Sequence, residues 1–250
     1  MAGHSKWATT KHRKAAQDKK RAAMFSKLSR NISIAARSGN DANPDNNAGL
    51  AAAIAKARSY SFPKDKIEAA IADAFKIAGG DDYVDVVYEG YGPAGAPIYV
   101  EALTDNRNRT AADVRRLFSR AGGSLGPSGS VEFQFERKGE ILTQPSGAMD
   151  ADEFTLLAAE AGAHDVAFGE EEWVVICAPT EVAIVRRHLE DAGVIIISAE
   201  LVMQPVTETV LDPAEAMRVL KLIGQLEELD DVQNVYHTMA LTDEILASME

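Results

Sequence analysis

The chain has 250 residues, 46% of them hydrophobic and 26% charged, and its 26 Lys and Arg against 38 Asp and Glu give a formal net charge of −12. This is ordinary globular composition with room for two or three domains. No stretch approaches the roughly 20 apolar residues that a membrane span needs, and a single cysteine, Cys177, excludes an intrachain disulfide, so a soluble cytoplasmic protein is expected.

Positive charge is concentrated at the N-terminus. The first 37 residues contain ten Lys or Arg and one acid, so this segment is net +9 and the remaining residues are net −21. An arm of one sign on a chain of the opposite sign attracts polyanions, which makes nucleic acid the expected partner. A solvated charged helix and a mitochondrial presequence are the alternatives, although presequences favour Arg and Ser where this arm favours Lys.

Three helices are predicted after the arm. Residues 1–22 lack strong apolar periodicity and indicate an extended or partly helical segment. In residues 24–38, 48–60 and 63–78, apolar side chains recur at spacings of three and four, as on one face of a helix. Short connections between such helices favour an antiparallel bundle. Beside the apolar stripe of the first helix, a basic ridge is expected from Lys20, Lys27, Arg30 and Arg37.

The hydrophobic period changes from 3.6 to 2 after the third helix, which indicates a domain boundary. Residues 84–88 and 98–103 are predicted to pair as a hairpin. A capping box that begins at Thr110 predicts a helix as far as Arg120, and a third strand is expected at residues 131–135.

Residues 140–203 have the pattern strand, helix, strand, strand, helix, strand, which is a complete split βαβ unit. Since that unit closes on itself, a strand near residues 206–210, a helix opened by Asp212 and a strand at 232–237 should return to the earlier sheet.

The predicted fold class is therefore α+β and multidomain. An N-terminal three-helix bundle is followed by two ferredoxin-like split βαβ modules, one of them discontinuous. The predicted domains are residues 1–78, residues 79–133 together with 205–250, and the inserted residues 134–204.

The arm is the strongest candidate site. Its spaced cations suit phosphate contact, and Trp7 offers a flat face on which a base can stack, although a Trp also often serves to pack. Lysine is a point charge suited to the backbone of a nucleic acid, so the arm predicts affinity more than sequence discrimination. The residues expected to bind are Lys6, Trp7, Lys11, His12, Arg13, Lys14, Lys19, Lys20 and Arg21, continued by Lys27 and Arg30 in the first helix.

A second candidate is the loop of residues 104–110, which leads from a strand into a helix. Arg107 and Arg109 lie there beside free helix N–H groups, where a phosphate can bind. The structural alternative is that Asp105 and Thr110 cap the helix while Arg107 and Arg109 pair with acids or face solvent.

No catalytic constellation is visible, so no enzyme, cofactor or metal is expected. The five His are scattered, no Ser lies in a nucleophile elbow, and the glycine-rich residues 122–130 lack the Gly-Lys-Ser/Thr of a phosphate-binding loop. A metal nuclease built from carboxylates distant in sequence is the remaining alternative of this class.

Several motifs of the chain resemble the YebC family. They are Met1-Ala2-Gly3-His4-Ser5-Lys6-Trp7, Lys11-His12-Arg13-Lys14-Ala15-Ala16-Gln17-Asp18, Tyr88-Glu89-Gly90-Tyr91-Gly92-Pro93 and Thr104-Asp105-Asn106-Arg107-Asn108-Arg109-Thr110. Because the resemblance begins at Met1, the arm is expected to belong to the mature protein. The resemblance implies a helical N-terminal domain followed by two α+β domains, one discontinuous, which agrees with the prediction above.

The resemblance also implies a function. Most members of the YebC family are described as probable transcriptional regulators that bind DNA in the bacterial cytoplasm. A mitochondrial relative, the translational activator of cytochrome c oxidase, and some bacterial members indicate instead a ribosome-associated translation factor that binds rRNA and aids elongation through proline-rich stretches. In the regulator, the acidic α+β domains are expected to contact protein or to shape specificity. The chain departs from the family at residues 47–51, where Asn-Ala-Gly-Leu-Ala replaces Asn-Pro-Arg-Leu-Arg and removes two arginines.

Overall fold

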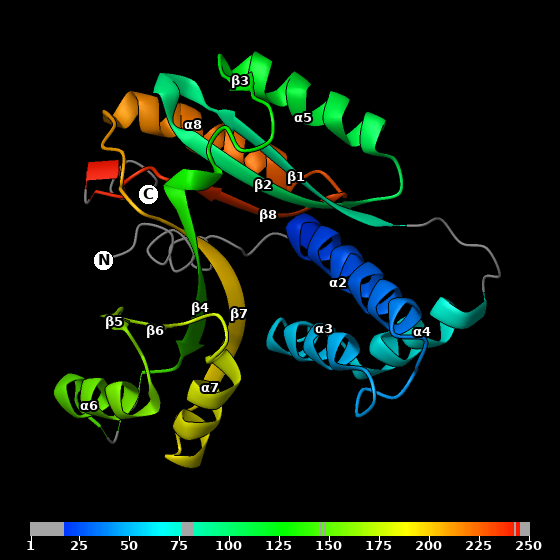
Figure 1. Ribbon diagram of the computed structural model, residues 1–250, viewed down its shortest axis with the longest axis vertical. Helices are drawn as coiled ribbons and strands as arrows, with labels where there is room; N and C mark the ends of the chain where they lie inside the picture. The colour runs from blue at the N-terminus through cyan, green and yellow to red at the C-terminus, as the bar shows by residue number, and fades with distance from the viewer. Residues whose placement is uncertain (1–17, 77–82, 146, 148, 243, 246–250) are drawn as a thin grey trace. The chain divides into compact units, whose positions relative to one another are not determined.

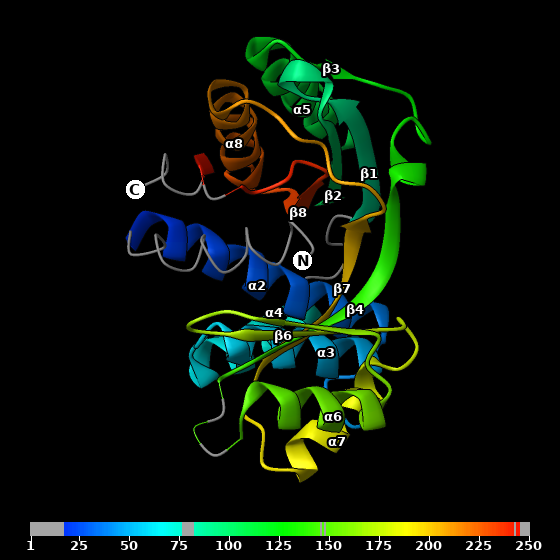
Figure 2. The same ribbon diagram turned by 90° about the vertical axis from the view of Figure 1, so that its left-hand side faces the viewer.

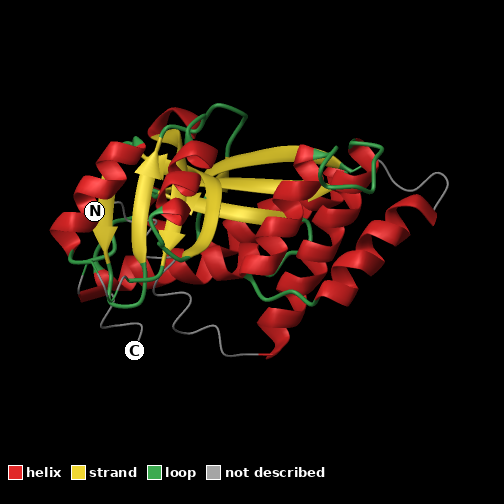
Figure 3. Cartoon of the chain, turned by 90° about the horizontal axis from the view of Figure 1, so that it is seen from below, coloured by secondary structure: helices red, strands yellow, loops and turns green. Residues whose placement is uncertain are grey.

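The computed structural model describes residues 18–76, 83–145, 147, 149–242 and 244–245, with side chains from Met24 to Phe75 and from Tyr83 onward. The chain divides into two compact units. The smaller unit is Glu136–Gln204, and the larger one combines the described parts of Lys14–Phe135 and Pro205–Glu250. The fold is α+β, as predicted, with N-terminal helices followed by two four-stranded sheets (Figure 3). This division does not separate residues 1–78 from the first sheet, so the three-domain boundaries stay a prediction.

The larger unit begins with three helices around an apolar core. They are α2 (Asp18–Ser38), α3 (Ala48–Ser59) and α4 (Lys64–Lys76). Asn47 connects the first two helices, because its side chain accepts from the Leu50 N–H at 3.0 Å and donates to the Ala35 carbonyl at 2.9 Å. A polar side chain buried at a helix N-terminus is thus fully used as a cap. The core consists of Leu28, Ile32, Ala36, Leu50, Ile54, Ala57, Phe62, Ile67, Ala70 and Ala74.

The first sheet lies in the same unit and has the strand order β3-β1-β2-β8. All three pairings are antiparallel, so α5 connects β2 to β3 across the intervening β1, which is a split βαβ crossover. Helices α5 and α8 lie beside this sheet (Figure 1). The elements are β1 (Val84–Tyr91), η1 (Pro93–Gly95), β2 (Pro97–Thr104), α5 (Arg107–Ala121), β3 (Ser124–Leu125), α8 (Pro213–Glu227) and β8 (Val232–His237).

Three element predictions in this unit are wrong. The third strand is β3 and not residues 131–135, where the chain forms the 3-10 turn η2 (Glu132–Gln134) before the next strand. Residues 206–210 form no strand, only a single parallel bridge from Thr209 to Met239. Helix α5 begins at Arg107 because Asn106, whose side chain accepts from the Arg109 N–H at 3.1 Å, is its cap. The predicted capping box fails because Thr110 is buried and bonded elsewhere.

The buried carboxylate of Glu89 explains why residues 126–132 turn instead of extending. Glu89 is 2% exposed, and its two oxygens accept from the N–H groups of Gly129, Val131 and Glu132 at 2.6 to 2.8 Å. A carboxylate that accepts hydrogen bonds from three backbone N–H groups fixes the chain in a turn around it. The neighbouring residue, Gly90, has no room for a side chain, because a Cβ there would lie 2.5 Å from the Ser124 carbonyl oxygen of β3.

Replacing Glu89 by glutamine is expected to lower the free energy of unfolding by about 2 kcal/mol, because one backbone N–H would then face an amide NH₂ in a buried site. Urea unfolding measures the change. The control is Glu132→Gln in the same loop, where the side chain is exposed and the effect should stay within about 0.5 kcal/mol. Equal effects of the two substitutions would contradict this account of the loop.

The smaller unit holds the second sheet, whose strand order β5-β6-β4-β7 matches the ferredoxin-like pattern. Strands β4 and β7 are adjacent in this sheet and are its two long strands in Figure 2. The core contains Phe154 and Trp173, whose rings meet edge to face at 4.7 Å, and the buried Cys177. Burial, followed by the charge of Glu181, raises the pKa of the Cys177 thiol. The elements are β4 (Phe135–Thr143), α6 (Ala151–Ala161), β5 (Asp165–Phe168), β6 (Trp173–Cys177), α7 (Val182–Asp191) and β7 (Ile196–Pro205).

Among the described residues, every helix is too short or too polar to cross a lipid bilayer.

Candidate nucleic-acid interface

The predicted binding arm lies mostly outside the described residues. Helix α2 begins at Asp18 and includes Lys19, Lys20 and Arg21, whose side chains also lie outside the described part. The arm residues for which the structure gives no position are Lys6, Trp7, Lys11, His12, Arg13 and Lys14.

The described cations of α2 bind the protein itself. The Lys27 side chain is 8% exposed and its Nζ donates to the Glu227 carbonyl at 2.6 Å. The Arg30 guanidinium donates to the Asp230 carbonyl at 3.0 Å and lies 5.5 Å from the centre of the Tyr83 ring. Further along the helix, Arg37 donates to the Ala74 carbonyl of α4 at 3.3 Å. This part of the basic ridge therefore fixes α2 in place.

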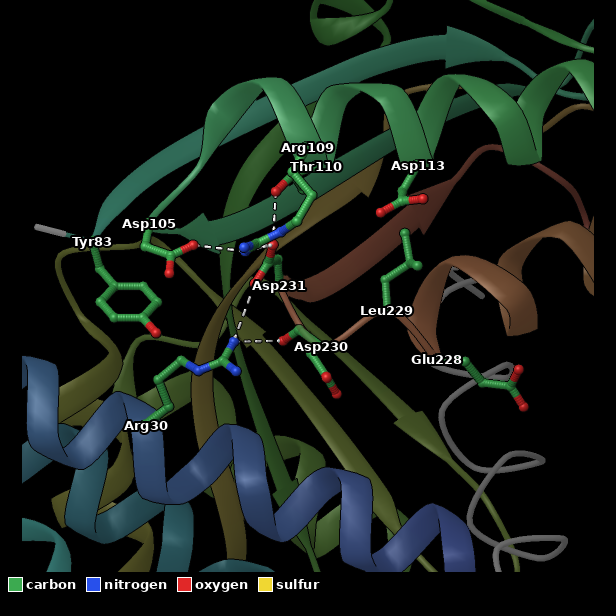
Figure 4. A pocket seen from close by; sticks show the side chains of 10 residues that line it. All are labelled: Arg30, Tyr83, Asp105, Arg109, Thr110, Asp113, Glu228, Leu229, Asp230 and Asp231. Carbon is green, nitrogen blue, oxygen red and sulfur yellow. Dashed lines mark hydrogen bonds and ion pairs between the residues drawn. The ribbon is translucent and has the colours of Figure 1, made fainter. Parts of the chain in front are cut away.

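Lys27 and Arg30 thus contact the C-terminal end of α8 and the loop that follows it, and the Asp231 carboxylate of this loop is the centre of a polar hub. Asp231 accepts from Thr110 Oγ1 at 2.7 Å, from Arg109 Nη2 at 2.9 Å and from Thr104 Oγ1 at 3.1 Å. Arg30 Nη1 approaches the other oxygen of Asp231 at 3.3 Å. Figure 4 shows Arg109 and Arg30 pointing toward Asp231 from two different helices. The hub thus joins α2, β2, α5 and the start of β8.

The hub stabilises the charged form of Asp231. Burial alone would raise the pKa of this carboxyl, but hydrogen bonds from Thr110, Arg109 and Thr104 and the charge of Arg109 outweigh it and hold the pKa below its usual range. Hydrogen bonds to Asp231 and then to Asp105 raise the pKa of Arg109. Burial, and then the nearby Asp231 charge, raise the pKa of Tyr88, whose hydroxyl donates to the Arg107 carbonyl at 3.2 Å.

This shift predicts a pH dependence of stability. Because the pKa of Asp231 is lower in the folded protein than its unfolded value of about 3.9, its contribution is complete above that value and is lost as the pH falls through the folded pKa. Between pH 6 and pH 3, the wild-type protein is expected to lose about 1 kcal/mol more unfolding free energy than Asp231→Asn. Urea unfolding at each pH tests this, and parallel curves for the two proteins would contradict it.

A hollow of about 450 Å³ opens beside the hub. Five of its ten lining residues are acidic and two are arginines, so it does not suit a phosphate. Among the described residues, no group of three or more His, Cys, Asp or Glu is placed to hold a metal ion. The lining residues are Arg30, Tyr83, Asp105, Arg109, Thr110, Asp113, Glu228, Leu229, Asp230 and Asp231 (Figure 4).

The two loop arginines have different surroundings. Arg109 is held by Asp105 at 2.6 Å and by Asp231, although half of its side chain is exposed. Arg107 is exposed and forms no ion pair with another described residue. The structural alternative is thus confirmed for both arginines, since Arg109 pairs with acids and Arg107 faces solvent. It is wrong about the cap, which is Asn106.

Three further arginines on α5 are exposed and were missed by the sequence reasoning, which considered only the loop. Arg115, Arg116 and Arg120 lie on the solvent side of this helix. Their signal was present in the sequence, since residues 107–121 hold five arginines and a single acid.

Two family models match the chain. The one described as the TACO1/YebC protein N-terminal domain matches residues 5–76, and the one described as the TACO1/YebC second and third domain matches residues 83–239.

Similar proteins cover the chain almost completely. A "Probable transcriptional regulatory protein" of Bifidobacterium animalis subsp. lactis is 50% identical over 251 residues, which cover 100% of this chain and 99% of that protein. A relative of the same name from Thermobifida fusca is 46% identical, with 100% of both chains covered. Among solved structures, a conserved hypothetical protein from Aquifex aeolicus is 41% identical and superimposes with a TM-score of 0.82, covering 92% of this chain and 94% of that one.

Proposed function

The chain belongs to the TACO1/YebC family, and on that premise we propose that it is a cytoplasmic transcriptional regulator that binds DNA through its basic N-terminal arm. The family resemblance predicted from the sequence motifs is confirmed. The name "Probable transcriptional regulatory protein", carried by relatives that match over their full length, supports the regulatory part of the proposal.

One observation carries the DNA-binding part, namely the separation of charge along the chain. A segment of net +9 precedes a remainder of net −21, so the arm is the part of the sequence that attracts polyanions most strongly. Seven Lys and Arg precede Met24, and each can neutralise one phosphate. Trp7 adds a face for stacking on an exposed base.

In this proposal, the contacts of α2 position the arm. Lys27 and Arg30 hold the helix on the C-terminal end of α8 and the loop after it, and Asn31 Nδ2 donates to Gln233 Oε1 of β8 at 2.8 Å. Because the arm leads directly into α2, a helix fixed at several points limits where the arm can reach. A restrained arm loses less entropy on binding than a free one.

The same arm suits ribosomal RNA, because phosphate contact and stacking do not distinguish DNA from RNA. A translation factor on the ribosome is therefore the competing outcome of the test. Neither role requires catalysis by the chain.

The test compares the two polyanions under one condition. The native protein is sedimented with ribosomes and, in parallel, captured on duplex DNA at the same salt concentration. Retention on DNA without sedimentation with ribosomes is the expected result. Sedimentation with ribosomes without capture on DNA would contradict the DNA-binding regulator and support the translation factor. Binding to neither ribosomes nor DNA would refute both hypotheses.

A further inference from the structure

Helix α5 carries a cluster of positive charges within the part of the chain that the structure describes. Its 15 residues hold Arg107, Arg109, Arg115, Arg116 and Arg120 against Asp113, a net charge of +4 in a chain of net −12. The buried side of the helix is formed by Thr110, Val114, Leu117 and Phe118, so the arginines lie away from the core. The helix thus has one apolar side that packs and one cationic side in solvent.

The solvent side has a defined arrangement. Consecutive residues of a helix are about 100° apart around the axis, so Arg115 and Arg116 lie on opposite flanks of the exposed side. Between these flanks lie only short side chains, those of Asn108, Ala112 and Ser119, all exposed. Arg120 follows Arg116 by one turn, about 6 Å along the axis. A large anion can therefore approach the middle of the helix and meet guanidinium groups on both sides.

These arginines are available to a ligand. Arg115 and Arg120 are exposed and form no ion pair with another described residue. Arg116 pairs with Asp113 at 2.8 Å, but about half of each side chain is exposed, and such surface pairs contribute under about 1 kcal/mol. Arg109 is held by the hub and therefore serves to anchor the first turn.

We infer that the exposed side of α5 is a second nucleic-acid-binding surface, which binds the phosphate backbone through Arg115, Arg116 and Arg120. The inference rests on the proposed function and adds to the arm a surface on a rigid element. Guanidinium groups suit this role because their planar fork binds a phosphate with two parallel hydrogen bonds. The arm then supplies mainly lysines, and α5 supplies arginines on a helix.

The test is the salt dependence of binding to duplex DNA by the full chain with Arg115, Arg116 and Arg120 all replaced by glutamine. The loss of three phosphate contacts should make the slope of log K against log salt less steep by about 2.7 and weaken binding about 100-fold at 0.15 M salt. Since all three side chains are exposed, the unfolding free energy should change by less than about 1 kcal/mol, which thermal unfolding verifies.

The control replaces Arg137, Arg186 and Arg187 of the smaller unit by glutamine, which changes the net charge by the same amount. Like the α5 variant, it disrupts one surface ion pair, that of Arg186 with Glu190. This control should bind with a slope close to that of the wild type. An unchanged slope in the α5 variant, or an equal change in the control, overturns the inference and leaves the arm proposal intact. Absence of DNA binding by the wild type itself refutes the proposed function and the inference together.

Discussion

Replacing Lys11, Arg13 and Lys14 by glutamine is expected to weaken binding to duplex DNA about 100-fold at 0.15 M salt. Each of these cations releases a counterion when it neutralises a phosphate, so the loss should grow as the salt concentration is lowered. Fluorescence anisotropy with a labelled duplex measures the affinity of both proteins.

The matched control replaces Arg58, Lys64 and Lys66, which are exposed cations of α3 and α4, by glutamine. It changes the net charge by the same amount as the arm variant. If the arm makes the contacts, the control should retain nearly the wild-type affinity. Equal losses in the two variants would show that net charge, and not the arm, governs binding.

Replacing Asp231 by alanine is expected to lower the unfolding free energy of the larger unit by about 2 kcal/mol. The substitution removes the acceptor shared by Arg109, Thr104 and Thr110 and leaves Arg30 with the Asp230 carbonyl. Arg109 would keep its pair with Asp105, and the hydroxyls of Thr104 and Thr110 would keep each other, but all three groups would lose the acceptor that they share. Urea unfolding followed by circular dichroism measures the effect.

The adjacent Asp230 provides the control, since it contacts Arg30 through its backbone carbonyl and has an exposed side chain. Asp230→Ala should change stability by less than about 1 kcal/mol. A small effect at Asp231, or a comparable effect at Asp230, would show that the hub does not hold these elements together.

Much of the fold could be predicted from the sequence because the apolar periodicity is local. The spacing of three and four gave the helices of residues 18–76, and the alternation gave the hairpin of β1 and β2. The errors lie where long-range contacts decide the backbone. The turn at Glu132 depends on a hydrogen bond from its N–H to the carboxylate of Glu89, 43 residues earlier. No local sequence pattern predicts this hydrogen bond.

The candidate site was predictable to a lesser degree for the same reason. Periodicity placed Lys27 and Arg30 beside the apolar stripe of α2. It could not show that the end of α8 and the following loop, about 200 residues later, would accept their hydrogen bonds. Asp231 carries no motif and is identified only by the four side chains that converge on it. The arginines of α5 were visible in the sequence, yet their exposure follows only from the packing of the opposite side.

The most direct test of the central claim, that this chain binds DNA through its basic arm, is the affinity of the native protein for duplex DNA over a series of salt concentrations. With seven arm cations and three on α5 in contact with phosphates, log K should fall steeply against log salt, with a slope of about −9. No measurable binding at 0.05 M salt, or an affinity independent of salt, would contradict the account.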